Sequence, residues 1–167
     1  MNAHTKLQVE ATPYMRPVFL HRDTIIKNTV HELQEIRKTV PFKAIAFRGL
    51  SGAMVAVSVA DKLKVGIIAC RKDNEKSHGY STVEGAVDVP YIIIDDFMDT
   101  GKTVEEIMAA IKNRDERLHT HSTCMGFYGY HRRTAFNQCS KEAAANAGIP
   151  ILNTVKPDRD TDEWDCC

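Results

Sequence analysis

Residues Tyr91–Thr103 read YIIIDDFMDTGKT, and this stretch predicts a strand, an acidic turn and a helix start in succession. Four apolar or aromatic residues form the predicted buried strand, and Asp95 and Asp96 follow it at once. After the turn, four apolar residues recur at helical spacing, namely Val104, Ile107, Met108 and Ile111. Ligands of open α/β sheets bind beyond the carboxyl ends of strands, so this stretch is a candidate binding site.

The predicted turn offers two kinds of chemical group to a ligand. Backbone N–H groups and the dipole at a helix start favour a phosphate. Carboxylates can hold hydroxyl groups or a hydrated metal ion. Both kinds lie within one short turn, and the combination suits a sugar phosphate.

The spacing of the motif excludes two other ligand-binding loops. Gly101-Lys102-Thr103 resembles the end of a P-loop, but a P-loop requires glycine five residues before Gly101, where this chain has Asp96. An EF-hand is excluded because the three aspartates lack its alternating spacing and its glycine. An ordinary turn with solvated aspartates is the remaining alternative.

The whole stretch resembles the motif that binds phosphoribosyl pyrophosphate (PRPP) in type I phosphoribosyltransferases. The match consists of four hydrophobic residues, two acids, two hydrophobic residues and Asp-Thr-Gly-x-Thr, position by position. The Asp-Thr-Gly-Lys-Thr segment looks most like the hypoxanthine-guanine branch of that family. The resemblance extends over roughly residues 41–155.

The composition is that of an ordinary globular protein of one domain. The chain has 167 residues, of which 43% are hydrophobic and 26% charged, and its basic and acidic residues balance at 22 each. Without a basic excess, no nucleic-acid partner is expected. No apolar run approaches the length of a membrane span and the N-terminus lacks a signal-peptide core, so no membrane partner is expected. The five cysteines form no C-x-x-C pair, so no zinc site is expected. Cys70 and Cys124 lie in apolar runs typical of reduced core cysteines, which favours a reducing, cytoplasmic location.

Periodic patterns along the chain predict an α/β fold with a parallel sheet flanked by helices. The expected strands are 43–47, 65–70, 91–94, 122–130 and 151–155. The expected helices run from Asp23 to just before Pro41, over 53–63, from 104 to about 114–117, and over 140–147. Residues 48–52 read as a tight turn with two glycines.

Three segments fall outside this pattern. Residues 1–21 are expected to form a loose arm, with at most one edge strand, and residues 156–167 an acidic tail. The single domain of residues 1–167 thus has its core at about 22–155. The polar segment 71–85 is long for a compact domain, and we interpret it as a candidate lid or as a surface loop without function.

The resemblance implies a reaction and a small hood built from the chain ends. In the family, PRPP gives ribose 5-phosphate to a nitrogenous base, pyrophosphate leaves, and Mg²⁺ is required. Asp95 and Asp96 match the acidic pair that serves the ribose, and they are also the candidate Mg²⁺ ligands, directly or through water. The predicted 5-phosphate site matches the family's loop at Thr100, Gly101, Lys102 and Thr103.

The resemblance also implies sites for the leaving group and the base. Arg48-Gly49 matches the family's pyrophosphate loop, which often holds a non-proline cis peptide. Arg71 and Lys72 begin the polar segment 71–85 and are candidates to reach the same anion. The candidate lid carries Tyr80-Ser81, the reverse of the Ser-Tyr order of the hypoxanthine-guanine branch. The candidate base-site residues are Asp99 near the purine N7 as the catalytic residue, Phe97 under the base, Arg132 at the 6-oxo group, and Trp164 as a cover.

Two functions from different classes fit this sequence. The first is a Mg²⁺-dependent phosphoribosyltransferase for a purine, with a 6-oxopurine favoured over a pyrimidine or an unusual base. The second is a PRPP- or nucleotide-binding regulatory protein without catalysis. Asp99 and the long polar segment favour the enzyme. The resemblance also implies a homo-oligomer, with a dimer favoured.

Overall fold

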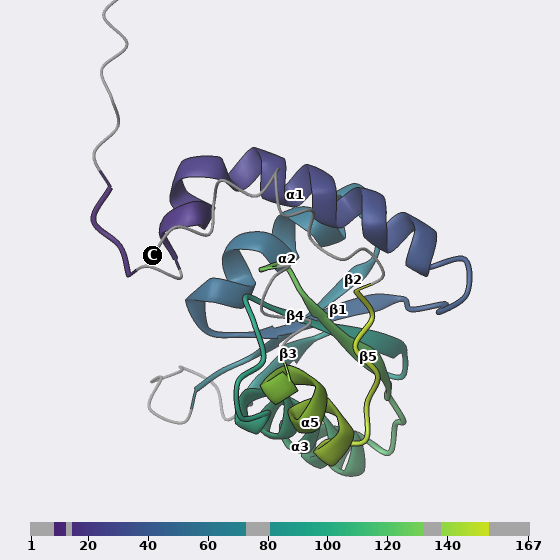
Figure 1. The fold of residues 1–167 in the computed structure, drawn as a ribbon. Helices are drawn as coiled ribbons and strands as arrows, with labels where there is room; N and C mark the ends of the chain where they lie inside the picture. The colour runs from purple at the N-terminus through teal and green to yellow at the C-terminus, as the bar shows by residue number, and fades with distance from the viewer. Residues whose placement is uncertain (1–8, 13–14, 73–80, 132–137, 154–167) are drawn as a thin grey trace, which may run out of the picture.

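The computed structural model describes residues 9–12, 15–72, 81–131 and 138–153, and within them it shows a five-stranded sheet between helices (Figure 1). The strand order is β3-β2-β1-β4-β5. β1 pairs in parallel with β2 and β4, β4 pairs in parallel with β5, and only β3 is antiparallel, to β2. The strands are β1 (Ala44–Arg48), β2 (Gly66–Cys70), β3 (Val83–Gly85), β4 (Pro90–Asp95) and β5 (Thr123–Gly129). The predicted α/β class is confirmed.

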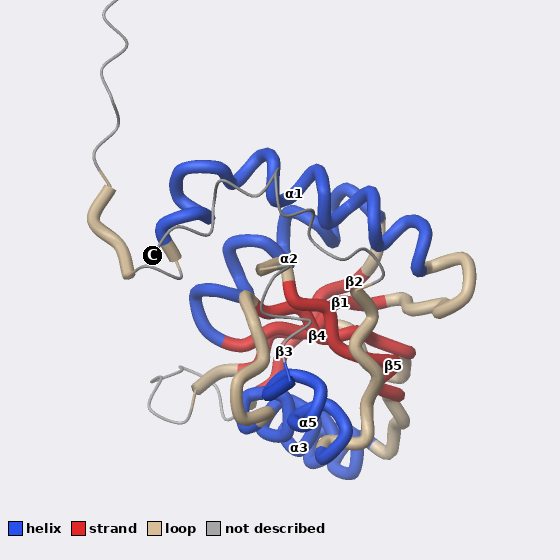
Figure 2. Tube along the Cα trace, viewed as in Figure 1, coloured by secondary structure: helices blue, strands red, loops and turns tan. Residues whose placement is uncertain are grey.

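Helices cover both faces of the sheet, as the tube view in Figure 2 shows. α1 (Arg16–Ile36) and α2 (Gly49–Leu63) lie on one face, and α3 (Lys102–Leu118) and α5 (Gln138–Asn146) lie on the other. Each face has its own apolar core, one built with α1 and α2 and the other with α3 and α5. No helix in the described part of the chain is long and apolar enough to span a bilayer.

β4 is the buried strand that the sequence motif predicts, and it lies between β1 and β5. Ile92, Ile93 and Ile94 are fully buried. Because successive strand residues point to opposite faces, Ile92 and Ile94 pack in the α1–α2 core whereas Ile93 packs in the α3–α5 core. A continuous apolar run is therefore required, and it leads directly to Asp95 and Asp96 at the carboxyl end of β4.

The N-terminal boundary of the folded region differs from the prediction. α1 begins at Arg16, inside the segment expected to be a loose arm, with Pro17 in its first turn. Proline is accepted there because the first helical N–H groups have no intrahelical partner. Val18 is fully buried, so this first turn belongs to the core.

Other boundaries also shift. α2 begins directly at Gly49, where a turn over 48–52 was predicted, and α3 continues to Leu118. The polar segment 71–85 contains the short strand β3, which the sequence analysis missed. Of the predicted strand 151–155, the described part forms a single bridge between Ile151 and Phe127. The predicted hood consists of the chain ends, and most of it, residues 1–8, 13–14 and 154–167, lies outside the described residues.

Candidate active site

A cavity of about 260 Å³ opens where β1 and β4 end and α2 and α3 begin. Parallel strands bring their carboxyl ends to one edge, so the motif turn meets the segment after β1 here. The cavity is lined by Arg48, Ser51, Lys72, Asp95, Asp96, Phe97, Met98, Asp99, Thr100, Gly101, Lys102, Thr103, Val104 and Phe127. Ten of the residues predicted for the site are among them.

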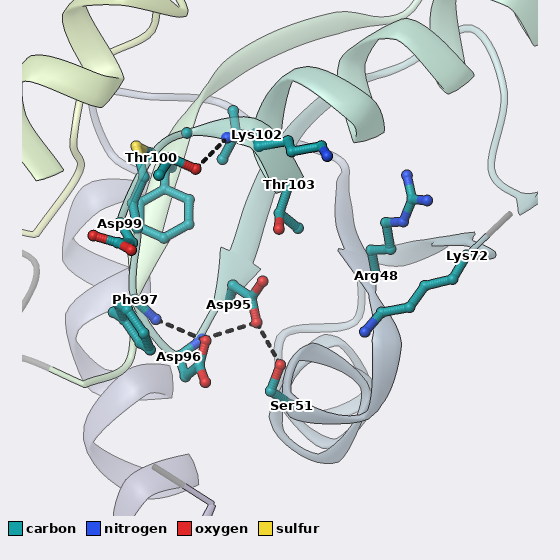
Figure 3. A pocket seen from close by; sticks show the side chains of 14 residues that line it. Arg48, Ser51, Lys72, Asp95, Asp96, Phe97, Asp99, Thr100, Lys102 and Thr103 are labelled. Atoms are coloured by element: carbon teal, nitrogen blue, oxygen red, sulfur yellow. Dashed lines mark hydrogen bonds between the residues drawn. The ribbon is translucent and has the colours of Figure 1, made fainter. Parts of the chain in front are cut away.

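The acidic pair lies at the centre of the cavity (Figure 3). The Ser51 hydroxyl donates a hydrogen bond of 2.8 Å to Asp95 Oδ1, and the backbone N–H of Asp96 donates to the same oxygen at 3.0 Å. The Phe97 N–H donates to Asp96 Oδ1 at 2.9 Å. Burial, and then the charge of Asp96, raise the pKa of Asp95 to about 7, against the opposing effect of the Ser51 bond. Asp95 therefore carries a costly buried charge that a cation or a hydroxyl donor would stabilise.

The predicted 5-phosphate loop has the geometry of an anion cradle. Gly101 caps α3 with φ +80°, a conformation that glycine adopts without strain. A Cβ on Gly101 would lie 3.2 Å from that of Ala143, so α5 packs tightly beneath the loop. Lys102 and Thr103 are exposed. The Lys102 N–H donates a long hydrogen bond of 3.4 Å to Thr100 Oγ1. Thr100–Thr103 thus line the cavity at the start of α3, where backbone N–H groups and the helix dipole favour a phosphate.

Two cations line the side opposite the acidic pair. Arg48 is buried at the end of β1, and its Nη1 lies 3.1 Å from Glu106 Oε2. Lys72 is exposed and packs over Gly49, since a Cβ on Gly49 would lie 2.9 Å from Lys72 Cε. In Figure 3 its ammonium group points toward Ser51 and Asp95. The cis peptide that the resemblance suggests at Arg48-Gly49 is not present, because every described peptide bond is trans.

Phe97 and Asp99 lie on the other side of the motif turn from Arg48 and Lys72 (Figure 3). Phe97 is half-buried and Asp99 is exposed. Between them, the buried Met98 accepts a hydrogen bond through its backbone oxygen from the Ser140 hydroxyl of α5. This contact anchors the turn, so the two side chains project from a supported backbone.

Several predicted residues are not brought to the cavity. Arg71 pairs with Glu84 at 2.7 Å across β2 and β3. Ser81 donates a hydrogen bond of 2.6 Å to the Val83 backbone oxygen. Neither residue lines the cavity. Gly49, predicted with Arg48, begins α2 and does not line the cavity either. The other predicted residues, Tyr80, Arg132 and Trp164, lie outside the described residues.

Two side chains that hold predicted site residues in place were not themselves predicted. Ser51 holds Asp95, and Glu106 holds Arg48. A hydroxyl just after the Arg48-Gly49 pair was the available signal for Ser51. No sequence signal pointed to Glu106, because a glutamate on the polar side of a helix is expected to face solvent unless its partner is known.

The acidic pair fits the hard cation that the resemblance implies. Mg²⁺ takes oxygen ligands, keeps several waters, and is commonly held by one or two carboxylates together with substrate phosphates. The part of the chain that the structure describes contains no cluster of three or more His, Cys, Asp or Glu side chains that could hold a metal alone. Asp95 and Asp96 would therefore share Mg²⁺ with ligand oxygens and water.

Comparison of sequences alone does not assign the chain to a family. No protein-family model matches it. No curated protein matches it either. Solved structures do, and their similarity lies in the fold.

Three solved structures illustrate the similarity. A phosphoribosyltransferase from Corynebacterium diphtheriae has 20% sequence identity and a TM-score of 0.59, with 82% of this chain and 81% of that chain covered. Orotate phosphoribosyltransferase from Mycobacterium tuberculosis, in complex with PRPP, has 14% identity and a TM-score of 0.58, with 82% and 75% covered. UMP synthase from Leishmania donovani has 17% identity and a TM-score of 0.58 over 83% of this chain, which spans only 28% of that longer chain.

The chain has the fold of the type I phosphoribosyltransferases. Adenine phosphoribosyltransferases also match, at 15% identity. The neighbours whose base is named act on orotate or adenine, so the resemblance to the hypoxanthine-guanine branch rests on the Asp-Thr-Gly-Lys-Thr segment alone.

Proposed function

We propose that this protein is a phosphoribosyltransferase that transfers ribose 5-phosphate from PRPP to a nucleobase and releases pyrophosphate. One observation carries the proposal: a single cavity joins the start of a helix, a carboxylate pair of which Asp95 is buried, and two cations. PRPP presents a phosphate, a ribose diol and a pyrophosphate, one for each of these groups. The shared fold supports the same conclusion, since one neighbour was solved with PRPP bound.

Each part of the cavity has a proposed role in binding PRPP. The backbone N–H groups and hydroxyls of Thr100–Thr103 hold the 5-phosphate. Asp95 and Asp96 accept hydrogen bonds from the ribose hydroxyls, and such charge-assisted bonds are strong. Arg48 and Lys72 hold the pyrophosphate. Mg²⁺ bound by the acidic pair would neutralise charge on the leaving pyrophosphate.

The base is proposed to be a 6-oxopurine. The Asp99 carboxylate accepts the proton that the purine loses while a ring nitrogen attacks the ribose, and general-base help of this kind contributes roughly 10²–10⁴-fold in rate. Phe97 supplies an aromatic face for the base. Both lie on the side of the turn away from Arg48, so the base would approach the ribose opposite the leaving group (Figure 3). The transition state is proposed to resemble an oxocarbenium ion, as in glycoside chemistry.

Ligand-induced stabilisation tests the proposed donor. Because a ligand that binds only the folded state raises the melting temperature, PRPP with Mg²⁺ is expected to do so. ATP with Mg²⁺ is expected to have little effect, because Asp96 stands where a P-loop has glycine. The matched control is Asp96→Asn, in which the PRPP effect shrinks. Equal stabilisation by ATP, or none by PRPP, would overturn the proposal.

A further inference from the structure

The buried Arg48 guanidinium is already paired in this structure. Its Nη1 lies 3.1 Å from Glu106 Oε2, and Lys102 Nζ lies 3.9 Å from Glu106 Oε1. Figure 3 shows the guanidinium of Arg48 extending away from Asp95, toward the side where Lys102 begins α3. Glu106 itself does not line the cavity. The Glu106 carboxylate therefore faces Arg48 of the proposed pyrophosphate site and Lys102 of the proposed 5-phosphate loop.

The two contacts of Glu106 differ greatly in strength. The Lys102 side chain is 79% exposed, and an exposed pair at 3.9 Å contributes almost nothing. The Arg48 side chain is 6% exposed, whereas that of Glu106 is 35% exposed. Water screens this second pair far less, and a buried guanidinium needs a counter-charge. Glu106 therefore acts mainly on Arg48.

We propose that Glu106 sets the affinity of the pyrophosphate subsite by competing with the ligand for Arg48; this rests on the proposed function. An incoming pyrophosphate must share or displace a guanidinium that one carboxylate already neutralises. The negative charge of Glu106, which water screens only in part, also repels the anion. When pyrophosphate leaves, the Arg48–Glu106 pair re-forms, which favours release of the product.

Removing the charge of Glu106 tests this proposal. Glu106→Gln keeps the shape and a hydrogen-bonding oxygen but not the charge. Isothermal calorimetry at fixed salt would measure two probes with Mg²⁺: inorganic pyrophosphate and ribose 5-phosphate. We expect pyrophosphate to bind about 5- to 10-fold more tightly, as the loss of a competing, partly screened charge implies. The affinity for ribose 5-phosphate is expected to stay within about 2-fold, because the contact with Lys102 is weak.

Two controls separate competition from a general charge effect. Glu105→Gln removes the neighbouring charge, which is exposed, and is expected to leave the pyrophosphate affinity unchanged. In an Arg48→Met background, Glu106→Gln is expected to have no effect on pyrophosphate, because the competed cation is gone. If Glu106→Gln does not fold, Glu106→Asp withdraws the charge by one methylene, and pyrophosphate is expected to bind more tightly by a smaller factor.

The outcomes are distinct. Unchanged or weaker pyrophosphate binding in the Glu106 variant overturns the inference, as does equal tightening in the Glu105 variant or an effect that persists without Arg48. If the wild-type protein binds both probes, these results leave the proposed function standing. If it binds neither probe, the proposed function fails, and the inference fails with it.

Discussion

Replacing Asp95 with asparagine is expected to stabilise the protein while weakening its ligand binding. Burial first, and the neighbouring Asp96 second, raise the pKa of Asp95 from 3.8 to about 7. Above pH 7 the folded state must therefore hold a carboxylate charge that it disfavours. An asparagine Oδ1 at the same place can still accept the hydrogen bonds from Ser51 and the Asp96 N–H.

The size of the stabilisation expected from Asp95→Asn follows from proton linkage. Between the two pKa values the folded state binds more protons than the unfolded state, so stability falls as the pH rises from about 4 to about 7 and then levels off. Near pH 8, where Asp95 is ionised in both the folded and the unfolded state, the pKa difference lowers the free energy of unfolding by about 4 kcal/mol. Near pH 5 the same relation lowers the free energy of unfolding by only about 2 kcal/mol. The stabilisation by Asp95→Asn should therefore grow by roughly 2 kcal/mol from pH 5 to pH 8.

Urea unfolding of the wild-type protein and of Asp95→Asn near pH 5 and near pH 8 would measure this difference. Asp99→Asn is the matched control: it lies on the same turn but is exposed, so its stability effect should stay within about 0.5 kcal/mol at both pH values. An Asp95 effect that is constant with pH, or that shrinks toward pH 8, would refute the reasoning. A stabilised variant that also lost PRPP binding would show that the charge is kept for function.

The other aspartates and the phosphate loop give separate predictions. Asp99→Asn should keep PRPP affinity near wild type in calorimetry but lower steady-state turnover about 10²-fold or more, whereas unchanged turnover would make it a structural residue of the turn. Asp96→Asn should weaken PRPP binding itself, because a charge-assisted hydrogen bond becomes a neutral one; equal loss in both variants would disprove this division of roles. Gly101→Ala should lower stability by about 1–2 kcal/mol in urea unfolding and weaken ribose 5-phosphate binding, because φ is +80° and the new Cβ would meet Ala143; wild-type values for both would contradict the packing argument.

The sheet and the motif turn were predictable because their patterns are local. The apolar run Tyr91–Ile94 must fill two cores at once, and no other regular element suits so short a buried run. The start of α1 was not predictable in the same way. Pro17 reads as a breaker, yet it is accepted in a first helical turn, and only the tertiary packing of Val18 decides between the two.

The contacts that tune the site depend on distant parts of the chain. Ser51 reaches Asp95 because α2 begins directly after β1, beside the end of β4. Glu106 reaches Arg48 because α3 packs against β1 in the assembled sheet. Short β3 exists only through its antiparallel pairing with β2, as in Cys70 opposite Val83. Local periodicity contains none of these relations, which only the assembled sheet creates.

The most direct test of the proposed reaction is a pyrophosphate-release assay. The protein would be mixed with PRPP and Mg²⁺ and with hypoxanthine, guanine, adenine or orotate in turn, and Asp99→Asn would serve as the control. The proposal predicts base-dependent pyrophosphate release, fastest with a 6-oxopurine and strongly reduced in the control. Release with adenine or orotate alone would refute the choice of base, and PRPP binding without release on any base would refute catalysis and indicate a PRPP-binding regulatory protein.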